Sequence, residues 1–152
     1  MINEKNSQTG EDMDNLLNFF LGKWVLIKGS CIYEQGLPPV DAQYQITYKT
    51  KDLLFEMVWL DNTGELHEFV FKSRPDGLAI PFMGGDLADS LSTVIVSERE
   101  LNTIAYKNEI KVMEVRRNLS NSLNQMTISQ TVFVSEKDNP TNWSSYSKVI
   151  VH

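Results

Sequence analysis

The sequence is poor in the residues that several common kinds of site require. It has one cysteine, Cys31, and two histidines among 152 residues. A disulfide framework and a cysteine-rich zinc cluster are therefore excluded. No apolar run reaches the roughly 18 residues of a membrane-spanning helix. Residues 1–14 are polar and acidic, unlike the basic and apolar regions of a signal peptide. These absences predict a cytoplasmic protein that does not insert into a membrane.

Basic side chains are also scarce. The chain carries 14 lysines and arginines against 20 aspartates and glutamates, for a net charge of −6. Binding to a phosphate backbone needs a basic stripe, and no run of lysine and arginine supplies one. Nucleic acid and an anionic membrane surface are therefore not expected partners.

The chain is predicted to form one domain, preceded by a tail. Residues 1–13 are polar and aperiodic, which is typical of disorder, and residues 14–152 form the predicted domain. Asp14 is suited to cap a short helix that ends at Gly22.

Strand patterns dominate the rest of the chain. Asp61-Asn62-Thr63-Gly64 and Pro75-Asp76-Gly77 are typical turn sequences. About ten short strands with hairpin spacing and no long helix favour an all-β barrel or sandwich. The predicted strands are 23–33, 42–50, 53–60, 65–74, 78–81, 91–97, 100–107, 110–119, 124–135 and 142–151.

The inward faces of these strands combine aromatic and methionine side chains with isolated polar groups, because alternate residues of a strand share a face. A sealed core would avoid a buried charge, so the mixture predicts a ligand cavity in which Arg117 offers two parallel donors to a carboxylate and Tyr146 completes the clamp. Alternatively, Arg117 lies on the surface and pairs with Glu114. The predicted ligand contacts are Phe55, Met57, Trp59, His67, Phe69, Met113, Arg117, Gln130, Tyr146 and Lys148.

The sequence offers little for catalysis. A nucleophilic triad needs a base, and only His67 and the terminal His152 could supply one. Glu65 and His67 share a strand face, but two ligands are too few to predict a metal site. We therefore predict no catalytic residue, no metal and no cofactor, and the sequence favours a binding protein without deciding whether the protein is an enzyme.

Phe19-Phe20-Leu21-Gly22-Lys23-Trp24 stands at the start of the first long strand pattern. Glycine lets the backbone turn into the strand, and tryptophan can fill the barrel floor. The segment resembles the start of lipocalin-like and fatty-acid-binding-protein-like barrels of the calycin group, and also small bacterial lipocalin-like domains of unassigned function and nitrobindin-like haem barrels. The resemblance implies an antiparallel up-and-down β-barrel of about ten strands with a short N-terminal helix.

The resemblance implies binding of a small, largely apolar or amphipathic ligand, such as a lipid, with a polar or anionic head group. Fatty-acid-binding proteins hold the carboxylate with an Arg-x-Tyr pattern, whereas Tyr146-Ser147-Lys148 reverses that order. Two alternatives stay open: a haem-binding or enzymatic barrel that uses His67, and a packed barrel that acts as a protein-interaction or dimerisation module. A homodimer is allowed, although no residue pattern demands it.

Overall fold

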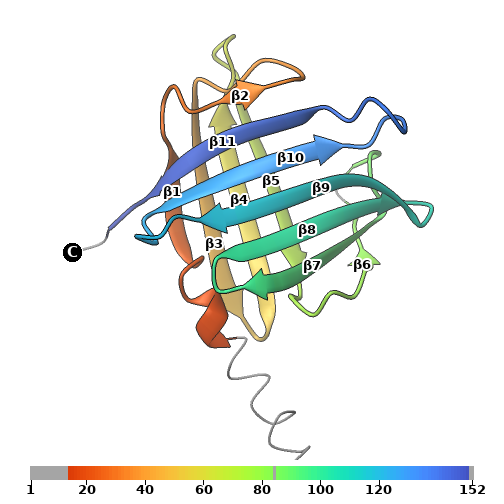
Figure 1. Ribbon diagram of the computed structural model, residues 1–152, viewed down its shortest axis with the longest axis horizontal. Coiled ribbons are helices and arrows are strands. Elements are labelled where there is room, and N and C mark those ends of the chain that lie inside the picture. The colour runs from red at the N-terminus through yellow and green to blue at the C-terminus, as the bar shows by residue number, and fades with distance from the viewer. Residues whose placement is uncertain (1–13, 84, 151–152) are drawn as a thin grey trace, which may run out of the picture.

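The computed structural model describes residues 14–83 and 85–150, so the tail predicted for residues 1–13 lies outside the described part (Figure 1). One short helix covers residues 14–17, and no helix in the described part is long and apolar enough to cross a membrane. The strands are β1 (Gly22–Leu26), β2 (Ile32–Tyr33), β3 (Asp41–Lys49), β4 (Asp52–Leu60), β5 (Leu66–Ser73), β6 (Ile80–Pro81), β7 (Ser90–Ser97), β8 (Glu100–Lys107), β9 (Ile110–Leu119), β10 (Gln125–Val132) and β11 (Thr141–Lys148).

All strand pairs belong to one antiparallel sheet that curls into a nearly closed barrel (Figure 1). The strand order is β5-β4-β3-β1-β11-β10-β9-β8-β7-β6, and β2 pairs with β11. The chain after β5 meets β7 through the Asp76–Val94 bridge and a 2.8 Å hydrogen bond from the Gly77 amide to the Thr93 carbonyl. Neighbouring strands are mostly consecutive in sequence, which confirms the predicted calycin-like architecture.

The strand predicted over residues 23–33 is broken in the structure. Leu26 of β1 pairs with Tyr146, and Ile32 of β2 pairs with Trp143. Between these two pairs the chain advances by six residues from β1 to β2 but by only three residues along β11. The extra residues between β1 and β2 therefore form a loop. Gly29, with φ of +86°, lies in that loop, where its backbone conformation strongly favours glycine.

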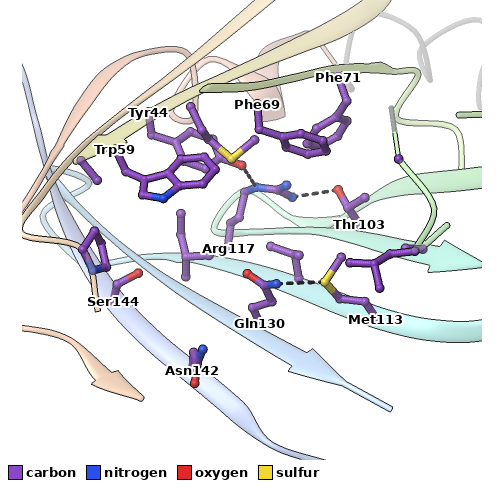
Figure 2. A pocket seen from close by; sticks show the side chains of 18 of the residues that line it. Tyr44, Trp59, Phe69, Phe71, Thr103, Met113, Arg117, Gln130, Asn142 and Ser144 are labelled. Atoms are coloured by element: carbon purple, nitrogen blue, oxygen red, sulfur yellow. Dashed lines mark hydrogen bonds between the residues drawn. The ribbon is translucent and has the colours of Figure 1, made fainter. Parts of the chain in front are cut away.

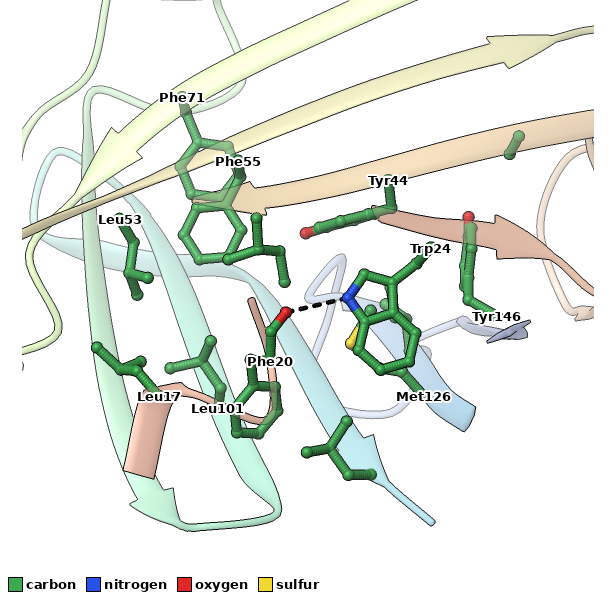
Figure 3. Packing of buried hydrophobic residues seen from close by; sticks show 14 of the residues in the cluster. Leu17, Phe20, Trp24, Tyr44, Leu53, Phe55, Phe71, Leu101, Met126 and Tyr146 are labelled. Carbon is green, nitrogen blue, oxygen red and sulfur yellow. Dashed lines mark hydrogen bonds between the residues drawn. The ribbon is translucent and has the colours of Figure 1, made fainter. Parts of the chain in front are cut away.

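A cluster of fully buried side chains lies where the short helix meets the barrel (Figure 3). Leu17, Phe20 and Trp24 are fully buried there, together with Leu101 from β8 and Met126 from β10. The indole Nε1 of Trp24 donates a 3.0 Å hydrogen bond to the carbonyl of Phe20. The apolar ring is therefore buried and its N–H group is hydrogen-bonded, as is usual for a buried tryptophan.

Gly22→Ala is expected to destabilise the barrel. Gly22 has φ of +125°, and a Cβ at this position would stand 3.5 Å from Cε of Lys148. The space is adequate, so the penalty comes from the backbone, and we expect at least about 1 kcal/mol of lost stability. Urea unfolding measures it. Gly85→Ala is the control, because Gly85 has a negative or extended φ and open space around it. Equal losses of stability in the two variants would contradict the assignment of the penalty to the positive φ of Gly22.

Candidate functional site: a cavity inside the barrel

The barrel encloses a cavity of about 550 Å³, within the range of small-molecule sites. Strands β4 and β5 supply one wall, which is rich in aromatic rings (Figure 2). Strands β8, β9 and β10 supply the opposite wall, which combines apolar side chains with the polar groups of Thr103, Arg117 and Gln130. At its mouth lie Leu37 and Pro39 from the loop between β2 and β3, and Phe82 and Leu87 from the loop between β6 and β7.

Most of the predicted ligand contacts come together around this cavity. Each stands on an inward-facing position of its strand, in agreement with the alternation of the sequence. Their role in binding stays a prediction. Those that line the cavity are Met57, Trp59, Phe69, Met113, Arg117, Gln130 and Tyr146.

The structure does not place Phe55, His67 and Lys148 among the lining residues. Phe55 is fully buried beneath the cavity and stacks on Phe71 with ring centroids 4.5 Å apart. Lys148 lies near the end of β11, where its Nζ stands 5.4 Å from the centroid of the Trp24 ring, and burial lowers the pKa of its amine. His67 turns toward the hairpin between β4 and β5. The alternation of side chains along a strand predicts which face each side chain lies on, but not how far along the barrel axis it lies.

Arg117 is the central polar residue of the cavity. Its side chain is 1% exposed and points inward from β9 (Figure 2). Its Nε donates to the Tyr44 hydroxyl at 3.0 Å, and one Nη donates to the Thr103 hydroxyl at 2.9 Å. The guanidinium carbon lies 4.3 Å from the centroid of the Phe55 ring. Arg117 is therefore held in place by neutral groups.

The alternative that places Arg117 on the surface beside Glu114 is wrong. Glu114 faces outward, where Lys111 and Arg116 bind it. Partial burial acts to raise the pKa of the Glu114 carboxyl, but the hydrogen bonds from Lys111 and Arg116 outweigh it, so the pKa is lowered. Within residues 14–83 and 85–150, no carboxylate oxygen lies within ion-pair distance of Arg117. The cavity thus contains a buried cation that has no counter-ion among the described residues.

Tyrosine hydroxyls add hydrogen-bonding capacity near Arg117. Tyr146 is buried, and burial raises the pKa of its hydroxyl, so the group stays protonated at neutral pH and can donate to an anion. Its ring packs edge-on against Tyr44 with centroids 5.9 Å apart. The hydroxyl that contacts Arg117 is that of Tyr44. Tyr44 and Thr103 are not among the predicted ligand contacts, although each stands within a predicted strand.

The hairpin between β4 and β5 forms part of the cavity rim through Asp61. One carboxylate oxygen of Asp61 accepts from the amides of Thr63 and Glu65, at 2.9 and 3.0 Å, and from the Thr63 hydroxyl at 2.6 Å. The other lies 2.8 Å from Nε2 of His67. His67 in turn stacks on Trp59 with centroids 5.3 Å apart. Asp61 therefore organises the hairpin and connects it to the cavity wall.

Asp61 is expected to stay ionised in mildly acidic solution. Hydrogen bonds from Thr63 and then His67 hold the pKa of its carboxyl well below the ordinary value of about 3.9. Because the folded-state pKa is lowered, this stabilisation is present above the unfolded pKa and is lost as the pH falls below it. A carbon-detected NMR titration should place the Asp61 midpoint well below the ordinary value for an aspartate carboxyl, about 3.9. A midpoint at or above that value would contradict the hydrogen-bond pattern.

No protein-family model matches the chain, and no curated protein matches it. Three of the solved structures that resemble it are a Schistosoma mansoni fatty acid binding protein in complex with arachidonic acid, a zebrafish ileal bile acid-binding protein complexed with cholic acid, and apocrustacyanin C2. Their sequence identities are 13%, 12% and 12%, and their TM-scores are 0.55, 0.51 and 0.50. The matches cover 88%, 87% and 95% of this chain and 98%, 100% and 68% of theirs.

At these identities the likeness concerns the fold. It agrees with the strand order and near closure described above. The chain therefore folds as a calycin-like β-barrel.

Proposed function

We propose that the protein binds a small, largely apolar molecule with an anionic head group inside the barrel. The observation that carries this proposal is Arg117, a buried cation that faces the cavity and meets neutral protein groups. Burying a charge without a counter-ion is costly. A bound carboxylate or related anion would offset that cost and would accept charge-assisted hydrogen bonds from the guanidinium.

The remaining cavity wall suits the apolar part of such a ligand. Phe69, Phe71 and Trp59 form an aromatic surface, and Met57 and Met113 add adaptable thioether side chains. Burial of apolar ligand surface would contribute roughly 25 cal/mol per Å² before the costs of ordering. The head group would then lie at Arg117 and the apolar chain would extend toward the mouth. Solved structures of similar barrels in complex with arachidonic acid and with cholic acid support this ligand class.

The other candidate functions are less well supported. A haem-binding or enzymatic barrel that uses His67 would need its imidazole at the cavity, but His67 is not among the lining residues and its Nε2 faces Asp61. A solidly packed interaction module does not agree with a cavity of about 550 Å³. A cytoplasmic location and a homodimer stay predictions.

Competition between an anionic amphiphile and its uncharged analogue tests the proposal. Dodecanoate and dodecanol share their alkyl chain and differ in the head group. Each would displace a cavity-bound fluorescent probe such as 1-anilinonaphthalene-8-sulfonate. We expect dodecanoate to compete at least about tenfold more strongly, because one charge-assisted hydrogen bond contributes about 1.5–3 kcal/mol. Equal competition would contradict an anion site, and the absence of any probe binding would contradict the cavity function itself.

A further inference from the structure

A second site lies on the hairpin at the rim of the cavity, formed by Asp61, Glu65 and His67. One ligating atom from each of these residues lies within 4.8 Å of the other two. The three side chains converge because Glu65 and His67 share one face of the chain entering β5, and Asp61 stands across the turn. The sequence offered Glu65 and His67 as a pair, and the folded hairpin adds the third donor.

We propose that these three residues bind a transition-metal dication such as zinc. The donor set is one imidazole and two carboxylates, which differs from a purely acidic cluster. Zinc accepts this combination of nitrogen and oxygen donors at about 2.0–2.2 Å. Oxygen-only cations such as calcium would gain little from His67. The site therefore selects for zinc and its neighbours in the transition series.

The side chains are positioned for an ion to enter with small movements. Nε2 of His67 and an oxygen of Asp61 lie 2.8 Å apart, within hydrogen-bond distance. A metal ion would bind Nε2 in place of the hydrogen-bond proton, which returns to the ring at Nδ1 by way of solvent so that the imidazole stays neutral, and the two ligating atoms would move a few tenths of an ångström apart. The side chains of His67 and Asp61 are 36% and 28% exposed, so an ion can reach them from solution. The other oxygen of Asp61 stays bound to the turn and fixes its orientation.

Three protein ligands leave one zinc position open, the arrangement found where zinc also binds water or a substrate. Asp61 lines the cavity, and His67 stacks on Trp59, which also lines it. A bound ion would therefore stand at the rim, close to where a ligand enters. This inference is independent of the anion site at Arg117.

Calorimetric titration with zinc chloride tests the site. We expect one zinc per chain, with an affinity that falls by about tenfold or more in both His67→Ala and Glu65→Gln, because loss of an outer-shell partner alone costs about 10- to 100-fold. Glu65 is exposed and its side chain makes no hydrogen bond in the described structure, so Glu65→Gln should fold normally. Glu68→Gln and His152→Ala are matched controls that should bind as the original chain does.

The alternatives give distinct results. Zinc binding that persists in His67→Ala, or that disappears in His152→Ala, would overturn the proposal. Calcium binding as strong as zinc binding would also overturn it, since it would mean that the carboxylates act without the imidazole. Cobalt supplies a readout of position: a paramagnetic ion at the site should broaden the indole NMR signal of Trp59 and leave that of Trp143 sharp. Equal broadening of both signals would contradict the location.

Discussion

Replacing Arg117 by methionine is expected to weaken the binding of dodecanoate by about 1.5–3 kcal/mol, the usual contribution of a hydrogen bond to a charged group. Methionine keeps much of the length of arginine and removes its charge. The binding of dodecanol should change little, because its hydroxyl gains much less from the guanidinium. The difference between the two ligands therefore isolates the charge. Probe displacement measures both affinities.

Two controls separate this effect from damage to the barrel. Arg116→Gln removes the neighbouring positive charge, which faces outward and binds Glu114, and it should leave both affinities unchanged. The unliganded Arg117→Met protein should keep its free energy of unfolding within about 1 kcal/mol, because relief of the buried charge offsets the lost hydrogen bonds. Unchanged dodecanoate affinity in a folded Arg117→Met protein would refute the role of Arg117.

Trp24→Ala is expected to lower the free energy of unfolding by about 3–5 kcal/mol, the usual cost of replacing a buried tryptophan or phenylalanine with alanine. Trp24 is fully buried against Phe20 and Met126, and the substitution also removes the hydrogen bond to the carbonyl of Phe20. Urea or thermal unfolding followed by circular dichroism measures the loss.

Trp24→Phe is the matched comparison, because it keeps an aromatic ring and should cost clearly less than the alanine variant. Trp143→Ala tests whether loss of any tryptophan lowers the free energy of unfolding by a similar amount. Trp143 is 38% exposed on the outer face of β11, so its loss should cost far less. A small effect of Trp24→Ala, comparable to that of Trp143→Ala, would contradict the account of the barrel floor.

Much of the fold was predictable because strand alternation and turn chemistry are local properties. The period-two pattern placed Met57, Phe69 and Arg117 on inward faces, and Asp61–Gly64 formed the expected hairpin. The break between β1 and β2 was not predictable. It arises from the register of both strands on β11, where Leu26 pairs with Tyr146 and Ile32 with Trp143, and register depends on residues more than a hundred positions away.

The site was predictable in kind but less so in detail. Inward polar residues indicated a cavity, yet Lys148 and Phe55 share those inward faces and lie away from it. Whether an inward side chain lines the cavity depends on its depth along the barrel axis, which is set by the tilt and length of the strands. Tyr44 and Thr103 were missed for the related reason that a hydrogen bond to Arg117 joins β3 and β8 to β9, a contact with no local signature.

The ionisation of a bound ligand tests the central claim most directly. Dodecanoate labelled with carbon-13 at its carboxyl group reports the pKa of that group inside the protein. If the head group lies at Arg117, the guanidinium favours the ionised form, so the bound carboxyl should titrate well below the range of a free fatty acid. The shift should disappear in Arg117→Met. A bound carboxyl that titrates in the ordinary range or above it would contradict the claim, because the head group would then lie in solvent at the mouth or among apolar side chains.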